Sequence, residues 1–186
     1  MNRILRKLFI LLLAACLLCL AACGGDEANV PAEKGEALFG SFAAMDLEGN
    51  AVNEEIFAGH KLTMINIWAT FCGPCISEMP DLAKLSTAYG DELQIVGIPV
   101  DITDRNGAVI PDQKALALEI IAHTGANYRH LIPSESLNKA YLFGVQVVPE
   151  TVFVDSEGRQ VGQSYLGARS EAEWRVIIES LLETLP

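Results

Sequence analysis

The fold is decided by residues 62–75, LTMINIWATFCGPC. Their first part, Leu62 to Thr70, is a nearly continuous apolar run, which is typical of a strand covered on both faces. A second such run, LQIVGIPVD, follows at Leu93 to Asp101. Between the two runs, apolar side chains recur at helical spacing, at Ile76, Met79, Leu82, Leu85, Ala88 and Tyr89. The order strand, helix, strand predicts a parallel pair joined by a crossover helix.

The chemistry of this stretch lies in Cys72-Gly73-Pro74-Cys75, at the end of the first strand and the start of the helix. Two cysteines three residues apart in a first helical turn can close a disulfide without remodelling the backbone. Pro74 is tolerated there because first-turn amides lack intrahelical partners. Cys72 lies nearer the positive end of the helix dipole, which favours a thiolate, so we predict Cys72 as the nucleophile. Cys75, one turn inside, is the predicted resolving thiol.

Two other interpretations of the cysteine pair stay open. Half of a zinc site would need two more ligands at suitable spacing, and His123 and His130 lie outside the usual spacing of a histidine pair. An inert structural disulfide is the other alternative. His60, His123 and His130 belong to no constellation of catalytic or metal-binding residues, and we interpret them as structural or surface residues. The sequence therefore predicts no metal site.

The N-terminus has the features of an export signal in residues 1–22. Basic side chains at Arg3, Arg6 and Lys7 precede an apolar run from Leu8 to Leu20, which is shorter than the roughly 20 residues of a membrane-spanning helix. The following Leu20-Ala21-Ala22-Cys23 resembles the lipobox of bacterial lipoproteins, which implies cleavage before Cys23 and a lipid on its sulfur. An uncleaved hydrophobic anchor is the alternative. Residues 23–36 then comprise the lipidated cysteine and a polar, flexible tether.

Length and charge limit the remaining possibilities. The chain has 186 residues, 51% of them hydrophobic, which suits one globular domain, expected over residues 37–186. Its formal net charge of −11 gives no electrostatic reason to bind nucleic acid. Five cysteines, three of them before residue 24, exclude a dense disulfide framework.

The rest of the chain predicts further strands and helices around the central pair. A small hairpin is expected from Phe39 to Met45 and Ala51 to Ile56, and a closing hairpin from Thr151 to Asp155 and Gln160 to Leu166. Further helices are expected at 113–124 and 135–143, with a short strand from Arg129 to Ile132 and a loop from Ile102 to Asp112 before them. A capping box formed by Ser170 and Glu173 opens a final amphipathic helix whose apolar face is Trp174, Ile177, Ile178, Leu181, Leu182 and Leu185.

These motifs resemble the thioredoxin superfamily, and within it the TlpA/ResA-like membrane-anchored thiol-disulfide oxidoreductases. The matching residues are Trp68 to Cys75, Glu78, Pro80, Val148-Pro149, Thr151 to Asp155 and Gly158. The resemblance implies an α/β, thioredoxin-like fold, with a central mixed β-sheet flanked by helices and an N-terminal β-hairpin extension. It also implies that Val148-Pro149 is cis and faces the cysteines, where the Val148 backbone would pair with an extended substrate. An ordinary trans proline beginning an edge strand is the alternative.

Several other residues are candidates near the site. Trp68 could contact substrate, although an aromatic residue at a strand end is more often partly core. Asn66 stands where thioredoxins carry a buried Asp and cannot act as a base. Asp101 is the acidic candidate for proton transfer, or else a turn or helix cap. Glu78 could tune the site or interact, as a first-turn carboxylate, with the helix dipole. Glu150 could adjust substrate choice or be an exposed charge at a strand edge.

The sequence predicts a lipid-anchored thiol-disulfide oxidoreductase on the outer face of the cytoplasmic membrane, or on the outer membrane of a two-membrane cell. It would be a monomer that reduces disulfides of exported proteins, such as apocytochrome c or a methionine sulfoxide reductase. The resemblance implies an electron donor of the CcdA/DsbD type and no cofactor beyond the redox-active disulfide. A thiol oxidase on the same fold is the alternative, and a copper-binding chaperone is a more distant one.

Overall fold

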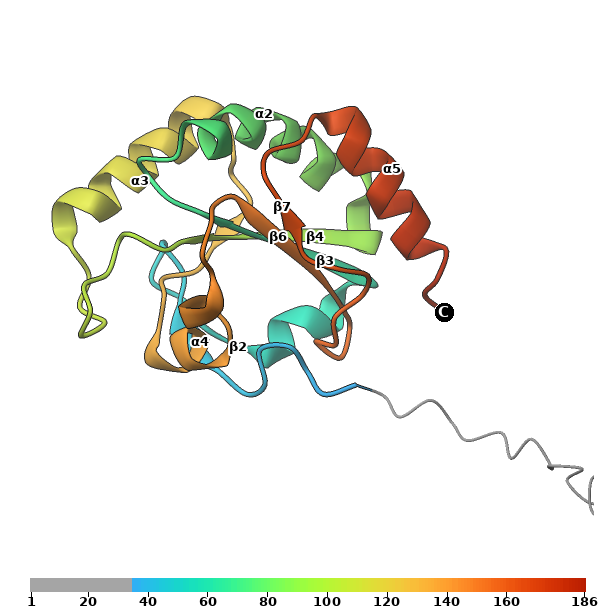
Figure 1. The fold of residues 1–186 in the computed structure, drawn as a ribbon, viewed down its shortest axis with the longest axis horizontal. Helices are drawn as coiled ribbons and strands as arrows, with labels where there is room; N and C mark the ends of the chain where they lie inside the picture. The colour runs from blue at the N-terminus through green and yellow to red at the C-terminus, as the bar shows by residue number, and fades with distance from the viewer. Residues whose placement is uncertain (1–34) are drawn as a thin grey trace, which may run out of the picture. The chain divides into compact units, whose positions relative to one another are not determined.

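A computed structural model describes residues 35–186. The predicted export signal, Cys23 and the tether up to residue 34 lie outside these residues. The centre of the described part is a five-stranded mixed sheet of order β5-β4-β3-β6-β7 (Figure 1). β3 pairs in parallel with β4, β4 pairs in parallel with β5, and the other neighbours are antiparallel. The strands are β3 (Leu62–Trp68), β4 (Leu93–Pro99), β5 (Arg129–His130), β6 (Glu150–Asp155) and β7 (Tyr165–Leu166).

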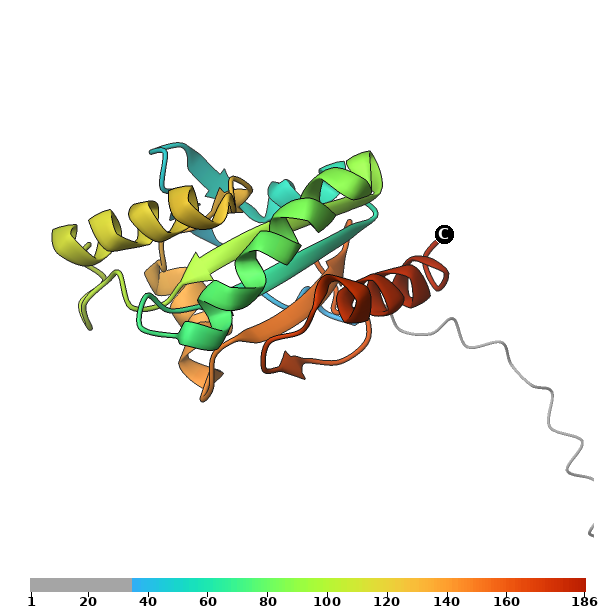
Figure 2. The ribbon, with the colours of Figure 1, turned by 90° about the horizontal axis from the view of Figure 1, so that it is seen from above.

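Helices and a hairpin cover the two faces of this sheet. One face carries the three longer helices, α2 (Gly73–Ala88), α3 (Pro111–Thr124) and α5 (Glu171–Leu182), and Figure 2 shows α2 crossing over the strands. The other face carries the hairpin of β1 (Ala43–Met45) and β2 (Ala51–Asn53), with α4 (Glu135–Ala140) and the short 3-10 helices η2 (Glu54–Gly59) and η4 (Leu142–Gly144). A third 3-10 helix, η3 (Gly90–Glu92), joins α2 to β4.

The continuous apolar sequence of β3 follows from this layering, because all seven of its residues are buried. Successive side chains of a strand point to opposite faces. Leu62 and Met64 pack with residues of α2 and α5, whereas Ile65 and Ile67 pack with residues of the hairpin and α4. The predicted parallel pair of buried strands with a crossover helix is confirmed.

The predicted hairpins are also confirmed, but with shorter strands. In the first, β2 ends at Asn53, whose side chain accepts a hydrogen bond from the Glu55 amide and so begins a 3-10 helix where a strand was expected. In the closing hairpin the first strand is β6, but of the predicted second strand, Gln160 to Leu166, only Tyr165–Leu166 form a strand, and Gln160 makes an isolated bridge to Val154.

The helix predicted at 135–143 is divided in two. α4 ends at Ala140, because Tyr141 has a non-helical backbone (φ −145°, ψ −47°), and η4 follows it. The predicted capping box of Ser170 and Glu173 is present at the start of α5. Within residues 35–186, no helix is both long and apolar enough to span a membrane.

The missing side chain of Gly97 makes room for the ring of His130. A Cβ atom at Gly97 would lie 2.1 Å from His130 Nδ1. This nitrogen faces the Trp68 indole N–H at 3.3 Å, and His130 Nε2 lies 3.0 Å from the Ala126 carbonyl oxygen. A neutral ring with its proton on Nε2 satisfies both hydrogen bonds, because Nδ1 then accepts from the Trp68 indole and Nε2 donates to the Ala126 carbonyl. Burial also lowers the pKa of His130 to about 4. Because the ring is buried and both its nitrogens have partners in the fold, His130 is a structural residue, the first of the two predicted possibilities.

We predict that this histidine makes the fold sensitive to mild acid. Between the ordinary pKa of 6.5 and the folded value of about 4, the unfolded chain binds a proton that the folded chain does not. The free energy of unfolding should fall over this range by about 3 kcal/mol from this group. Urea unfolding of the full chain at pH 7 and pH 4, compared with His130→Gln, measures the difference. Equal losses in both proteins would contradict this role.

Candidate active site

The loop between β3 and α2 is held by Asp101, which follows β4. Both carboxylate oxygens of Asp101 accept from the Thr70 amide, at 3.1 and 3.0 Å, and the Thr70 hydroxyl donates to Asp101 Oδ2 at 2.5 Å. The Cys72 amide donates to the Ala69 carbonyl at 3.0 Å. Parallel strands β3 and β4 end at the same edge of the sheet, and this pairing of their ends fixes the path of the chain into the cysteines.

Cys72 and Cys75 form a disulfide at the N-terminus of α2, with their Cα atoms 5.3 Å apart. Cys72 is the N-cap residue, and its sulfur accepts a hydrogen bond from the Cys75 amide at 3.2 Å. Its exposed fraction is 6%, against 0% for Cys75. Of the two cysteines only Cys72 keeps any exposed area, and a thiolate there would be stabilised by an amide and the helix dipole.

The Val148-Pro149 peptide bond is cis, as the resemblance implied, and it lies beside the disulfide. Cys72 Sγ is 3.6 Å from the Val148 carbonyl oxygen. A disulfide sulfur carries no proton, so this is a contact in the oxidised form and a possible hydrogen bond only in the dithiol form. The loop residue Val147 is 55% exposed.

The prediction that Trp68 contacts substrate is wrong for this structure. Its exposed fraction is 0%, and its indole points inward to His130. The exposed aromatic side chain next to the cysteines is Phe71, at 78%. Its position directly before Cys72 is the sequence signal that identifies it.

Glu78 is a buried acid one turn beyond Cys75 in α2. The interpretation as a first-turn carboxylate is wrong, because the first turn of α2 holds no acidic residue. Glu78 Oε1 accepts from Asn66 Nδ2 at 3.0 Å, and Oε2 accepts from the Arg169 amide at 3.1 Å and the Trp174 indole at 3.2 Å. Burial raises the pKa of Glu78 above its ordinary value, although these three donors oppose the rise.

Asn66 brings a polar side chain into the middle of β3. Its Nδ2 donates to Glu78 and also to Thr151 Oγ1 at 3.1 Å, while its Oδ1 is buried without a hydrogen-bond partner in the described chain. The sequence signal was an amide within the apolar run LTMINIW. That signal showed that Asn66 was unusual, but not that it would bind Glu78.

Glu150 is not an exposed charge at a strand edge. It is 8% exposed, and its Oε1 accepts from the Tyr141 hydroxyl at 2.6 Å. Strand alternation turns Glu150 to the face of the sheet that carries α4, while the next residue, Thr151, faces Asn66 and α2. Burial is the main cause that raises the pKa of Tyr141 to about 12, so its hydroxyl stays a donor at neutral pH.

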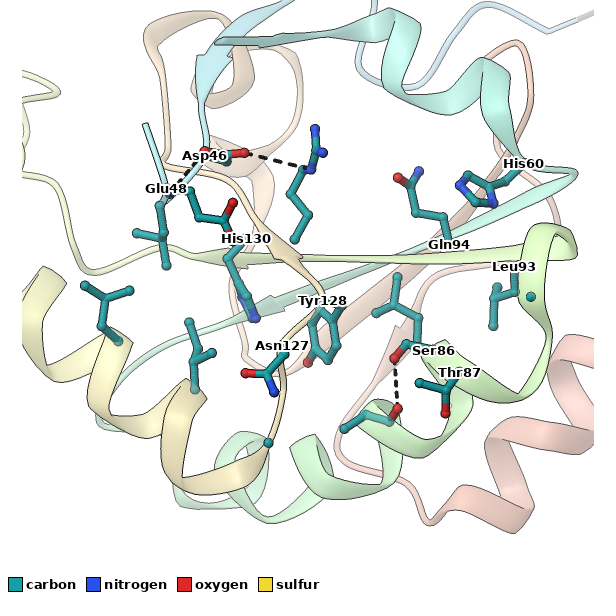
Figure 3. Close-up of a pocket in the computed structure, with 18 residues that line it drawn as sticks. Asp46, Glu48, His60, Ser86, Thr87, Leu93, Gln94, Asn127, Tyr128 and His130 are labelled. Atoms are coloured by element: carbon teal, nitrogen blue, oxygen red, sulfur yellow. Dashed lines mark hydrogen bonds and ion pairs between the residues drawn. The ribbon is translucent and has the colours of Figure 1, made fainter. Parts of the chain in front are cut away.

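A pocket lies elsewhere, along β4, β5 and the ends of α2 and α3 (Figure 3). It has a volume of about 600 Å³, and its labelled lining includes His60, Gln94, Tyr128 and His130. Neither cysteine lines it, nor does Pro149. This pocket is therefore separate from the redox site around Cys72.

Comparison with known proteins identifies the family to which this chain belongs. The sequence model of the Redoxin family matches residues 28–176. The chain belongs to the Redoxin family. It is 29% identical over 150 residues to the thiol:disulfide interchange protein DsbE of Pseudomonas fluorescens, covering 81% of this chain and 76% of that protein. It is 23% identical over 146 residues to the thiol-disulfide oxidoreductase ResA of Halalkalibacterium halodurans, covering 78% and 73%.

Solved structures show the same fold. A thioredoxin-family thiol:disulfide interchange protein from Chlorobium tepidum superimposes with a TM-score of 0.63 at 22% identity, covering 76% of this chain and 93% of that chain. The fold is thioredoxin-like, with the predicted mixed sheet and N-terminal hairpin. With the cysteine pair in place, this Redoxin-family chain is a thiol-disulfide oxidoreductase of the DsbE/ResA type.

We predict that Glu78, and not Asp101, exchanges a proton with Cys75. When dithiothreitol attacks Cys72, Cys75 leaves as a thiolate that needs a proton. The rate, normalised to dithiothreitol thiolate, should fall as pH rises through the raised pKa of Glu78. Glu78→Gln should remove this step and slow the reaction about tenfold below it.

Asp101→Asn is the matched control, because it also replaces a carboxylate by an amide near the loop. It should keep the pH step of the wild-type chain, since Asp101 binds Thr70. A flat profile in Asp101→Asn with a normal one in Glu78→Gln would return the role to Asp101.

Proposed function

We propose that this chain is a membrane-anchored, extracytoplasmic reductase of protein disulfides. The observation that carries the proposal is the asymmetry of the pair: Cys72 caps the N-terminus of a helix and keeps a small exposed fraction of 6%, whereas Cys75 is fully buried one turn from an acid. An inert structural disulfide needs neither this asymmetry nor the neighbouring acid. The names of the relatives, interchange protein and oxidoreductase, support exchange chemistry.

The reaction proceeds in two exchange steps. The Cys72 thiolate attacks a substrate disulfide, forms a mixed disulfide, and the released substrate sulfur takes a proton. Glu78 accepts the proton of the Cys75 thiol, and the Cys75 thiolate attacks Cys72. The second substrate sulfur leaves as a thiolate and takes up this proton, which returns Glu78 to its carboxylate form. Two electrons pass from the Cys72–Cys75 dithiol to the substrate, and the two protons end on the substrate thiols. The cysteines carry the electrons, so the proposal requires no metal or organic cofactor.

Substrates of this reductase are extended segments of exported proteins. The carbonyl of Val148, beside Cys72, offers main-chain pairing, and exposed Phe71 and Val147 provide apolar contact. Apocytochrome c and methionine sulfoxide reductase carry suitable disulfides. A membrane carrier of the CcdA/DsbD type returns the electrons, and the protein acts as a monomer.

The direction of electron flow is tested by the redox potential of the pair. Thiol trapping of the full chain across dithiol buffers should give a potential near that of thioredoxin, about −270 mV. A value near that of DsbA, about −120 mV, would contradict a reductase and favour the oxidase alternative. Cys75→Ser is the control, because it leaves Cys72 without its disulfide partner and so removes the Cys72–Cys75 transition.

The proposed membrane anchor is a lipid on Cys23. The basis for this proposal is the resemblance of Leu20-Ala21-Ala22-Cys23 to a lipobox. We expect the full chain expressed in a bacterium to lose residues 1–22 and to gain the mass of a diacylglycerol. Mass spectrometry of the purified chain checks both, and Cys23→Ser should stay unlipidated. An unmodified Cys23 on an intact N-terminus would contradict the anchor.

A further inference from the structure

One side chain of the final helix, α5, makes a hydrogen bond to Glu78 of the cysteine-bearing helix. Trp174 is fully buried in α5, and its indole nitrogen lies 3.2 Å from Glu78 Oε2. The residues joined by this hydrogen bond lie 96 positions apart in the sequence. Helical spacing predicts Trp174 only as part of the apolar face of this helix, where its ring does pack, against Phe153 and Tyr165.

We propose that Trp174 is a positioning residue for thiol-disulfide exchange: its indole holds the Glu78 carboxylate in place beneath the cysteine helix, which makes α5 part of the proton-transfer machinery. The inference rests on the proposed function, because it assigns Glu78 the proton of Cys75. Trp174 itself touches neither the substrate nor the cysteines in this account. It acts only through Glu78.

The loop before α5 fixes the orientation of the Trp174 indole. The guanidinium of Arg169 lies over the Trp174 ring, 5.0 Å from its centroid, and over the Tyr165 ring at 5.3 Å. The same guanidinium donates to the carbonyls of Leu166 and Gly167, at 3.2 and 2.8 Å. The Arg169 amide donates to the same Glu78 oxygen as the indole. One residue thus fixes the ring and supplies a second donor.

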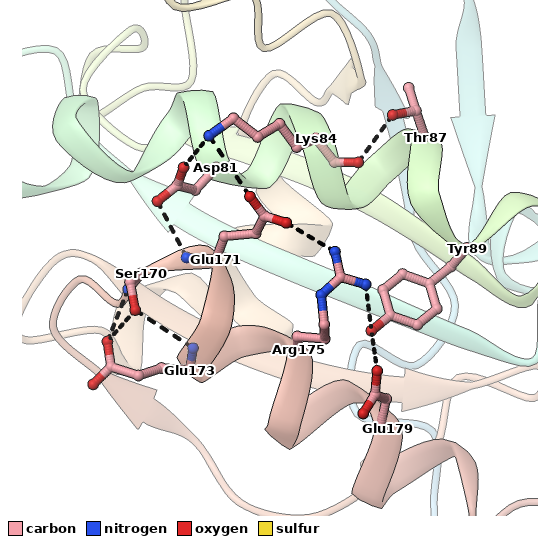
Figure 4. A network of polar contacts seen from close by, with 9 residues as sticks. All are labelled: Asp81, Lys84, Thr87, Tyr89, Ser170, Glu171, Glu173, Arg175 and Glu179. Atoms are coloured by element: carbon pink, nitrogen blue, oxygen red, sulfur yellow. Dashed lines mark hydrogen bonds and ion pairs between the residues drawn. The ribbon is translucent and has the colours of Figure 1, made fainter.

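Polar contacts on the surface lock α5 onto α2 (Figure 4). The Glu171 amide, at the start of α5, donates to Asp81 Oδ2 at 3.1 Å, and Lys84 lies 2.7 Å from Asp81 and 3.6 Å from Glu171. Further along, Arg175 lies over the ring of Tyr89 at 5.5 Å. Single exposed ion pairs contribute little, but this connected set fixes the register of the two helices.

The donors around Glu78 cannot replace it as a proton carrier. Asn66, the Arg169 amide and the indole of Trp174 do not titrate, so they stabilise the carboxylate without exchanging its proton. The charged or titratable groups that act on Glu78 are Arg169, whose charge lowers its pKa, and Tyr128, whose own pKa is raised by burial and by the charge of Glu78. Cys75, one turn earlier in α2, is the group whose proton the proposed function assigns to Glu78.

The test compares the chain's two tryptophans. Trp174→Phe removes the donor to Glu78 and keeps an aromatic ring, whereas Trp68→Phe removes a similar buried donor that points to His130. Losing a hydrogen bond to the charged form should move the pH step of dithiothreitol reduction upward by about one unit in Trp174→Phe. Trp68→Phe should leave the step in place, and Trp174→Phe should change nothing further in a Glu78→Gln background.

A second measurement does not depend on activity. In nitrogen-15 spectra of the full chain, the indole signal of Trp174 should titrate with the midpoint of Glu78 and become flat in Glu78→Gln, while the Trp68 signal should not follow it. A flat Trp174 signal in the wild-type chain would overturn the inference, even if Trp174→Phe does not fold. An equal shift in both phenylalanine variants would also overturn it.

The two proposals can fail separately. A wild-type pH profile in Glu78→Gln would refute the proposed role of Glu78, and with it any effect of Trp174 on exchange. A titrating indole together with a normal pH step in Trp174→Phe would refute only the inference.

Discussion

The parallel pairing of β3 with β4 is the constraint on which the redox site depends. Seven residues of each strand are in register, and both strands end at the same edge of the sheet. Asp101, just past the end of β4, can therefore bind Thr70, just past the end of β3. This contact sets the course of the loop that delivers Cys72 to the first position before α2. If the register slipped by one residue, every side chain of β3 would change face.

A row of polar groups crosses the otherwise apolar face of the sheet under α2. Pairing in the sheet places Asn66 between Gly97 and Thr151. The ring of His130 occupies the space over Gly97, and Glu78, from α2, accepts a hydrogen bond from Asn66. An acid in such a place is costly to ionise, because three neutral donors compensate only part of its lost hydration. The same cost makes it a proton acceptor and donor at a higher pH than an exposed glutamate.

Local patterns were sufficient to predict most of the framework. The apolar runs at β3 and β4, the helical spacing after Cys75 and the capping box at Ser170 each depend on neighbouring residues, and each is confirmed. The family resemblance added the cis proline, which spacing alone does not predict. The partners of Glu78 were not predictable, since Arg169 and Trp174 come from a loop and a helix some 90 residues away. The burial of Trp68 depended likewise on a glycine in β4 and a histidine in β5.

The position of α5 in the chain has a consequence for assembly. Ribosomes make the N-terminal part first, so both cysteines and Glu78 exist long before residue 174 is added. Until the last helix docks, the acid lacks two of its three hydrogen-bond donors. The nascent protein therefore carries a reactive thiol pair without a finished proton acceptor. The redox centre is therefore complete only in a chain that includes its last helix, so a truncation before residue 169 removes part of the site although it leaves both cysteines and Glu78 in place.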